Sequence, residues 1–321
     1  MKAAIFCFQK PSPTSIVAST NLAIWLGKTL NLPVLYDAGV TAEPWDVLII
    51  VNGAFAFCKH LAELGSAVQR AGRVVWAQQD YTIVPPKPTS DAESPFRKAF
   101  ADRHAEGLPG IDYWTTVARN AKATPQSRYI NWNSLTYTAT PSSTIQKERS
   151  KVVPRLLYYG AYRNNRESAF MRYFGDPDHT ALVPTTVSSS LAGGKRFKEL
   201  YPAVEVLPAF ERGTFAATLR GYALGLYIED KKSHTEFHSP ANRFYEMLGA
   251  GLPMVFEPEA VPMLARAGFE VGAYTAVTAK DLKLLLRQAE LVGQEQREKW
   301  GKNYRNLLTK SVVSTWKEYC K

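Results

Sequence analysis

Runs of consecutive apolar residues recur along the chain, and each is followed by a segment whose apolar residues have helical spacing. The clearest run is 46–51 (DVLIIV), a pattern typical of a parallel strand covered on both faces. Similar runs occur at 2–9 (KAAIFCFQ) and 73–78 (RVVWAQ), and the segments 20–30 and 57–70 carry helical spacing. Strands that alternate with helices in this way predict an α/β fold with a doubly wound parallel sheet.

The alternation is interrupted twice. Residues 81–110 hold five prolines and carry several basic side chains, which indicates a long loop beyond the sheet edge, and such loops are usually functional or disordered. Residues 138–150 (TATPSSTIQKERS) lack apolar periodicity and are predicted to be a linker. Further strands are expected at 33–36, 113–117, 128–132, 155–159, 179–183, 204–207, 223–228 and 254–256, and further helices at 166–174, 242–249, 261–267 and 279–291.

These patterns predict two Rossmann-like domains of similar size that face one another across a cleft. The first covers residues 1–145 and the second covers 151–300. The segment 301–321 is expected to form a C-terminal helix that can return to the first domain. Clefts between domains are favoured places for ligands.

Composition narrows the class of protein. A chain of 321 residues that is 45% hydrophobic can form a large core, which excludes a wholly disordered or fibrous protein. Its 39 Lys and Arg against 29 Asp and Glu give a net charge of +10, which suggests an anionic partner. With three cysteines, no signal-peptide pattern and no apolar stretch of membrane-spanning length, we expect a cytoplasmic protein that does not bind membranes.

The first candidate site is the segment 159–168 (YGAYRNNRES), at the end of a predicted strand and the start of a helix. Ligands bind at such strand ends in open α/β sheets, and helix N-termini favour phosphate. Gly160 permits close approach of the backbone, and Arg163 and Arg166 could clamp a diphosphate. The competing interpretation is a solvated helix start with two surface arginines.

The second candidate site is the helical segment 243–253 (RFYEMLGAGLP), in which Arg243 and Glu246 share one face. The arginine could contact phosphate and the glutamate could accept hydrogen bonds from ribose hydroxyls. An ordinary ion pair within the helix is the competing interpretation. A third candidate is Asp80, just after the strand 73–78, which could act as a general base or merely form a turn.

These segments resemble the DNA β-glucosyltransferases of T-even bacteriophages, which have the two-domain GT-B fold. In that family a turn reading Gly-Gly-Ser-Phe-Arg is followed by Arg-Glu-Ser; here 160–163 (GAYR) is one residue shorter and is followed by 166–168 (RES). The family's Arg-Val-Trp-Glu-Thr-Met helix resembles 243–247 (RFYEM). Its Asp-Lys pair resembles Asp230–Lys231, its Val-Val-Asn segment resembles 51–52 (VN), and its catalytic aspartate resembles Asp80.

The resemblance implies the transfer of glucose from UDP-glucose, the donor substrate, to a hydroxymethylated pyrimidine in double-stranded DNA. The acceptor would be 5-hydroxymethylcytosine or 5-hydroxymethyluracil, flipped out of the stack, and the reaction would invert the anomeric carbon. Asp80 would be the catalytic base. The implied donor-binding residues are Gly160, Arg163, Arg166, Asp230, Lys231, Arg243 and Glu246.

The expected partners are double-stranded DNA and a UDP-sugar, bound by a monomer. The residues expected to contact DNA are Arg97, Lys98, Arg103, Lys195 and Arg196. No His pair or Asp-x-Asp motif offers a metal site, so none is assigned, and a divalent cation on the donor diphosphate stays open.

Two rival functions remain. One is a GT-B glycosyltransferase with a small-molecule, lipid or polysaccharide acceptor. The other is a DNA-binding protein that kept the fold and lost catalysis. The presence of Asp80 together with both arginine segments argues against the second.

Overall fold

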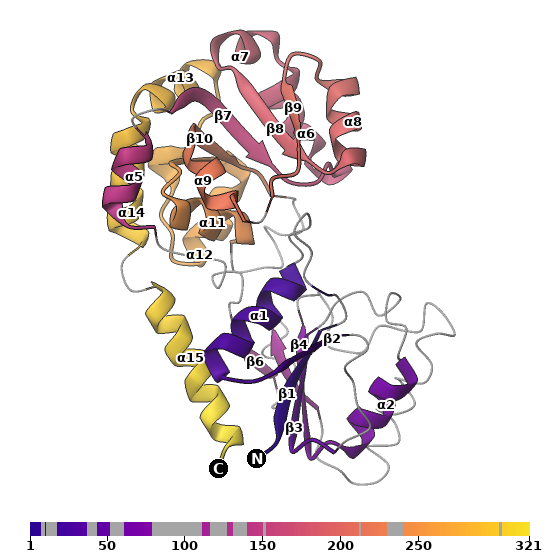
Figure 1. Cartoon of the computed structure of the whole chain (residues 1–321). Coiled ribbons are helices and arrows are strands. Elements are labelled where there is room, and N and C mark those ends of the chain that lie inside the picture. The colour runs from indigo at the N-terminus through magenta and orange to yellow at the C-terminus, as the bar shows by residue number, and fades with distance from the viewer. Residues whose placement is uncertain are drawn as a thin grey trace. The chain divides into compact units, whose positions relative to one another are not determined.

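A computed structural model of the chain describes residues 1–7, 10, 18–36, 44–51, 61–78, 111–115, 127–130, 140–149, 152–211, 213–229, 240–301 and 304–321. The chain forms two compact units, drawn in Figure 1. The first comprises Met1–Ser12, Ile16–Leu135 and Arg305–Lys321, and the second comprises Pro13–Ser15 and Thr136–Tyr304.

The first unit is built on a six-stranded sheet with the order β2-β1-β3-β4-β5-β6. Every neighbouring pair of strands is parallel. The strands are β1 (Ala3–Cys7), β2 (Val34–Tyr36), β3 (Val47–Val51), β4 (Arg73–Gln78), β5 (Ile111–Thr115) and β6 (Ser127–Tyr129).

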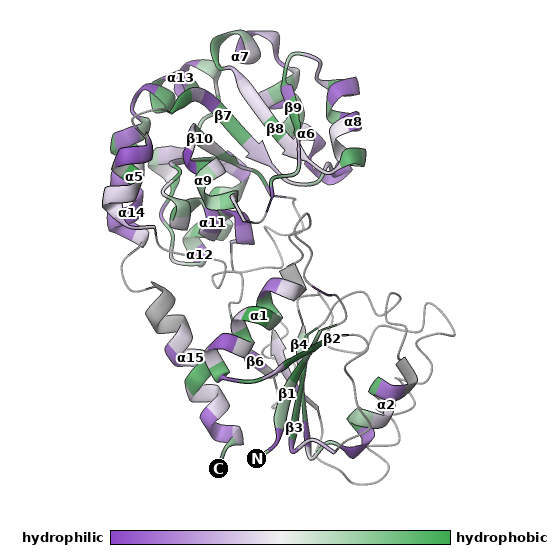
Figure 2. Ribbon diagram, in the orientation of Figure 1, coloured by the Kyte–Doolittle hydropathy of each residue, from purple (hydrophilic) through white to green (hydrophobic). Residues whose placement is uncertain are grey.

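Successive side chains of these strands enter two separate cores. Ile49 packs with α1 (Ala18–Leu30) and α15 (Tyr304–Tyr319), whereas its neighbours Leu48 and Ile50 pack with α2 (Leu61–Arg70). Because both faces of the sheet are covered, a central strand must be apolar at every position, which explains the uninterrupted apolar runs. In Figure 2 the central strands of this sheet are mostly green, the colour of hydrophobic residues.

The second unit is built on a five-stranded parallel sheet with the order β11-β10-β7-β8-β9. The strands are β7 (Val153–Tyr159), β8 (Thr185–Ser189), β9 (Glu205–Pro208), β10 (Tyr222–Tyr227) and β11 (Met254–Phe256). The chain builds the sheet in one direction from β7 to β9 and then crosses back to β10. The carboxyl ends of β7 and β10 therefore form the switch point at which open α/β sheets bind ligands.

Helices and short helical turns connect these strands and follow the last of them. They are α5 (Ser142–Arg149), η5 (Asn164–Arg166), α6 (Glu167–Phe170), η6 (Met171–Gly175), α7 (Pro177–Leu182), α8 (Leu191–Leu200), α9 (Phe215–Arg220), α11 (Asn242–Ala250), η7 (Pro258–Ala260), α12 (Val261–Arg266), η8 (Gly272–Tyr274), α13 (Ala279–Arg287) and α14 (Ala289–Trp300). None of the helices in the described ranges is both long and apolar enough to span a membrane.

The prediction of a strand at 179–183 is wrong, because this segment belongs to helix α7. The Asp176 side chain accepts a hydrogen bond from the backbone N–H of Asp178, and Pro177 stands at the first helical position, so the chain carries two helix-start signals. The second strand of this sheet is instead β8, whose sequence TTVSS does not read as an apolar run.

The linker predicted at 138–150 is also wrong in part, because it contains α5. Ile145 is buried, and the Arg220 side chain donates a hydrogen bond to Glu148. These contacts assign α5 to the second unit, which begins at Thr136. A single buried apolar residue in an otherwise polar segment leaves no periodicity from which a helix could be recognised.

Candidate functional site

The site begins where β7 ends, at Gly160. The Gly160 backbone N–H donates to the carbonyl of Ser188, and the Ser189 hydroxyl donates to the carbonyl of Gly160, so the turn is held against β8. Gly160 has a φ of +143°, and a Cβ there would collide with the Arg243 guanidinium. Only glycine combines this backbone conformation with such a close approach.

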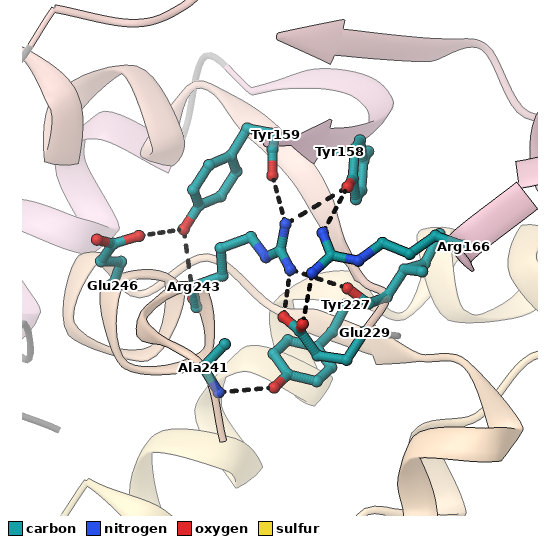
Figure 3. A network of polar contacts seen from close by, with 9 residues as sticks. Tyr158, Tyr159, Arg166, Tyr227, Glu229, Ala241, Arg243 and Glu246 are labelled. Carbon is teal, nitrogen blue, oxygen red and sulfur yellow. Dashed lines mark hydrogen bonds and ion pairs between the residues drawn. The ribbon is translucent and has the colours of Figure 1, made fainter. Parts of the chain in front are cut away.

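Two arginines from different segments meet at one carboxylate, as Figure 3 shows. Glu229 lies two residues beyond the end of β10, and its Oε2 is 2.7 Å from Nη2 of Arg166. Its other oxygen, Oε1, pairs with Nη2 of Arg243. The side chains of Arg166 and Glu229 are buried, and that of Arg243 is nearly so. The trio carries one more positive than negative charge.

Neighbouring polar atoms fix the Arg243 guanidinium. Its Nη1 donates to the Tyr159 carbonyl at 3.2 Å, and its Nη2 donates to the Ile228 carbonyl at 3.0 Å. Arg243 and Arg166 also both donate to the Tyr158 hydroxyl. Burial lowers the pKa of Arg243, but the charge of and hydrogen bond to Glu229, together with Tyr158 and Tyr227, raise it by more in sum, so the guanidinium stays protonated.

Glu246 lies one turn further along α11 and contacts Tyr159. The Tyr159 hydroxyl donates to Oε2 of Glu246 at 2.9 Å. Burial raises the pKa of the Glu246 carboxyl, although the hydrogen bond from Tyr159 and the charge of Arg243 oppose this. Burial and the Glu246 charge raise the pKa of Tyr159 well above its usual range, so this hydroxyl keeps its proton. Glu246 is thus held by a hydrogen bond from Tyr159 at the end of β7. It does not form the ion pair with Arg243 that the competing interpretation of this helix expected.

The other predicted site residues are more exposed or lie outside the described residues. Arg163 is exposed at the residue that precedes η5. Lys195 and Arg196 are exposed on α8, where the Arg196 guanidinium lies 5.8 Å from the ring centroid of Tyr162 in the turn after β7. The predicted residues outside the described part of the chain are Asp80, Arg97, Lys98, Arg103, Asp230 and Lys231.

Within the described ranges, no three His, Cys, Asp or Glu side chains lie close enough together to hold a metal ion.

Sequence reasoning missed Glu229, the residue that joins the two arginine segments. It directly follows the apolar segment of β10, so a carboxylate at the carboxyl end of a buried strand was the available signal. The resemblance drew attention to the next two residues, Asp230 and Lys231, instead.

Comparison with known proteins identifies the fold. Neither a protein-family model nor a curated protein sequence matches the chain. Among solved structures, T4 phage β-glucosyltransferase in complex with UDP and Mn²⁺ matches over 99% of this chain and 97% of that chain, with 15% identity and a TM-score of 0.62. The fold is that of the GT-B glycosyltransferases.

Two other GT-B structures are similar. An α-glucosyltransferase in complex with UDP and a 13-mer DNA containing an HMU base matches over 93% of both chains, with 10% identity and a TM-score of 0.58. The Anabaena protein HepE in complex with UDP-glucose matches over 99% of this chain and 100% of its own, with 12% identity and a TM-score of 0.54.

Proposed function

We propose that the chain is a UDP-glucose-dependent glucosyltransferase that modifies hydroxymethylated pyrimidines in double-stranded DNA. The observation that carries this proposal is the meeting of Arg166 and Arg243 at Glu229, at the switch point of the second sheet. A nucleoside diphosphate is the anionic ligand that this position and charge suit best.

The charge of the trio supports the binding of a diphosphate. Two buried guanidiniums share one carboxylate, and an incoming anion would add to the compensation of their charge. Arg163 is exposed beside them and can reach a ligand without a rearrangement of the core. In this proposal Arg163, Arg166 and Arg243 bind the diphosphate, Gly160 lets the backbone approach it, and Glu246 binds the ribose.

Asp230 and Lys231 complete the donor site in this proposal, and Asp80 acts as the base that takes the proton of the hydroxymethyl group. The hydroxymethyl oxygen would then attack the anomeric carbon of glucose with inversion, and UDP would leave. The target base must be flipped out of the duplex to reach the donor.

The DNA acceptor has two supports, the chain's net charge of +10 and its fold likeness to DNA-bound α-glucosyltransferase. Lys195 and Arg196 on α8, with Arg97, Lys98 and Arg103, are the proposed DNA contacts. A transferase with a non-DNA acceptor is the second candidate, because the fold is shared with HepE, whose structure is described with UDP-glucose and without DNA.

A transfer assay separates the two candidates. The full-length protein is incubated with radiolabelled UDP-glucose and with duplexes that differ only in one base, namely cytosine, 5-hydroxymethylcytosine, thymine or 5-hydroxymethyluracil. We expect label on one or both hydroxymethylated duplexes and none on the others. Binding of UDP-glucose without transfer to any duplex would favour a different acceptor.

A further inference from the structure

A pocket of about 430 Å³ opens beside the arginine pair. Its volume is within the roughly 300–1,000 Å³ of small-molecule sites. Residues after the ends of three parallel strands line it: Arg166 and Ser168 after β7, Glu229 after β10, and Glu257 and Glu259 after β11. The pocket therefore adjoins the proposed diphosphate position and shares two residues with it.

Glu257 is a buried carboxylate with little hydrogen bonding. Its side chain is 2% exposed, and Nη1 of Arg172 donates to its Oε1 over 3.4 Å, a long contact. Among the described residues, no closer hydrogen-bond donor to this carboxylate is found. An ionised carboxylate can accept about four hydrogen bonds, so Glu257 has capacity left for a ligand in the pocket that it lines.

The character of the lining indicates the class of ligand. Glu229, Glu257 and Glu259 would repel a second anionic group, and an apolar group would remove water from these carboxylates without replacing its hydrogen bonds. A neutral ligand with several hydroxyl donors satisfies both conditions. A hexose has this chemistry, and in a nucleotide sugar it is attached directly to the second phosphate.

We propose that this pocket holds the hexose of the nucleotide sugar, and that Glu257 and Glu259 accept hydrogen bonds from its ring hydroxyls. This assignment rests on the proposed function, because it takes the diphosphate to lie on Arg166 and Arg243. Glu257 would be a specificity-determining residue for the sugar, and the nucleotide would be recognised without it.

Titration of Glu257 supports a distinctive pH dependence. Burial and the charge of Glu259 raise the pKa of Glu257 to about 7, although Arg172 opposes the shift. Tyr173 faces it as well, and Arg166 and Glu229 lie across the pocket. Hydroxyl donors bind the ionised carboxylate, so the preference for UDP-glucose over UDP is expected to increase as the pH rises through about 7.

Calorimetry with UDP and UDP-glucose tests the assignment. In Glu257→Gln we expect UDP affinity to stay within about twofold of the wild type. UDP-glucose affinity should fall about 10- to 100-fold, the usual effect of losing a hydrogen bond to a charged group. The matched control is Glu205→Gln, which removes a carboxylate that contacts Arg155 at 3.3 Å outside the pocket lining. The control should leave both affinities unchanged.

Two further measurements distinguish the loss of a sugar contact from a folding defect. Thermal melting reports the fold of each variant, and the exposed Glu259→Gln variant should show a smaller loss of the same kind. The same titrations at pH 6 and pH 8 should show the rising preference in the wild type and a flat profile in Glu257→Gln.

The possible failures are distinguishable. An unchanged preference for UDP-glucose in both variants, or an equal loss of UDP and UDP-glucose affinity in Glu257→Gln, would overturn the hexose pocket and leave nucleotide binding intact. Wild-type protein that does not bind UDP would instead overturn the proposed function on which this inference rests.

Discussion

The sheets of the two units bury their strands by different chemistry. The central strand β3 of the first unit has the sequence VLIIV, and its burial is purely apolar. In the second unit β8 has the sequence TTVSS, and all five residues are equally buried. The hydroxyls of Thr186 and Ser188 donate to the Glu205 carboxylate and to the Pro208 carbonyl, both at 2.8 Å. A buried strand therefore needs either apolar side chains or hydrogen-bond partners for its polar ones.

The same difference extends to charged groups. Among the described residues of the first unit, Thr20 is the one buried polar side chain. The second unit buries Arg166, Arg220, Glu229 and Glu257. Burial of charge stabilises a fold poorly, and perturbed ionisable groups cluster at functional sites. Under the proposed function this difference corresponds to a division of labour, with donor binding in the second unit and the proposed catalytic base, Asp80, in the first.

The largest expected effect tests this division in the first unit. Asp80→Asn keeps the size of the side chain and removes the proton acceptor, so turnover should fall by roughly 10²–10⁴-fold. UDP-glucose affinity should barely change, because the proposed donor contacts belong to the second unit. A single-turnover assay on hydroxymethylated DNA, with calorimetry and thermal melting in parallel, measures all three quantities. Normal turnover by a folded Asp80→Asn protein would show that Asp80 only forms a turn.

The next effect concerns the second unit. Arg166→Ala removes a charge-assisted contact worth about 1.5–3 kcal/mol, so UDP affinity should fall about 10- to 150-fold. Arg166→Lys, which keeps the charge without the planar fork, should be intermediate. Arg155→Ala is the control, because Arg155 pairs with Glu205 and not with Glu229. Calorimetry that gives equal UDP affinity for all three variants would contradict the arginine clamp.

A pair of near-isosteric substitutions tests the contrast between the two sheets. Val75→Thr places a hydroxyl among apolar neighbours at a fully buried position of β4 and should lower the free energy of unfolding by about 1–3 kcal/mol. Thr186→Val removes one hydrogen bond from β8 and should lower it by about 0.5–1.5 kcal/mol. Urea unfolding of both variants gives the comparison. A larger loss for Thr186→Val would mean that the β8 hydroxyls matter more than apolar packing.

The smallest expected effect concerns DNA contacts on α8. Lys195→Gln should weaken DNA binding modestly and uniformly across sequences. It should also reduce the slope of log affinity against log salt by about 0.9, the contribution of one phosphate contact. Lys299→Gln on α14, which removes a lysine paired with Glu270, is the control and should leave the slope unchanged. Equal slopes for both variants and the wild type would remove Lys195 from the DNA surface.

Most of the fold could be predicted because its strands obey a simple rule. Where both faces of a sheet are covered by helices, as at β1, β3 and the middle of β4, a strand whose polar groups have no partners must be apolar. The strand β8 could not be predicted in this way, because its hydroxyls are hydrogen-bonded to partners that only the folded chain brings near. One such partner is the Gly160 carbonyl, which accepts from Ser189. The segment of α7 is predicted as a strand, although the sequence contains the helix-start signals described above.

The two arginines of the candidate site could be predicted from the sequence, but the pairing of both with one glutamate could not. Arg166 and Arg243 stand in recognisable strand-to-helix and helical segments. Their meeting depends on the spatial order of β7 and β10, which are neighbours in the sheet and separated in sequence by two other strands. Glu257 directly follows β11 and Glu229 lies two residues beyond β10, so a rule that selects carboxylates at strand ends would predict both.

The return of α15 to the first unit has a consequence for synthesis of the chain. Val312 and Trp316 of this helix complete the core that contains Ile5 and Ile49. During translation these residues leave the ribosome after every residue of the second unit's sheet. The apolar face that α15 covers therefore stays exposed until α15 has been synthesised. A chain that was cut short before residue 305 would contain the sheet of the second unit and a first unit whose exposed apolar face favours aggregation, a target suited to chaperones and proteases.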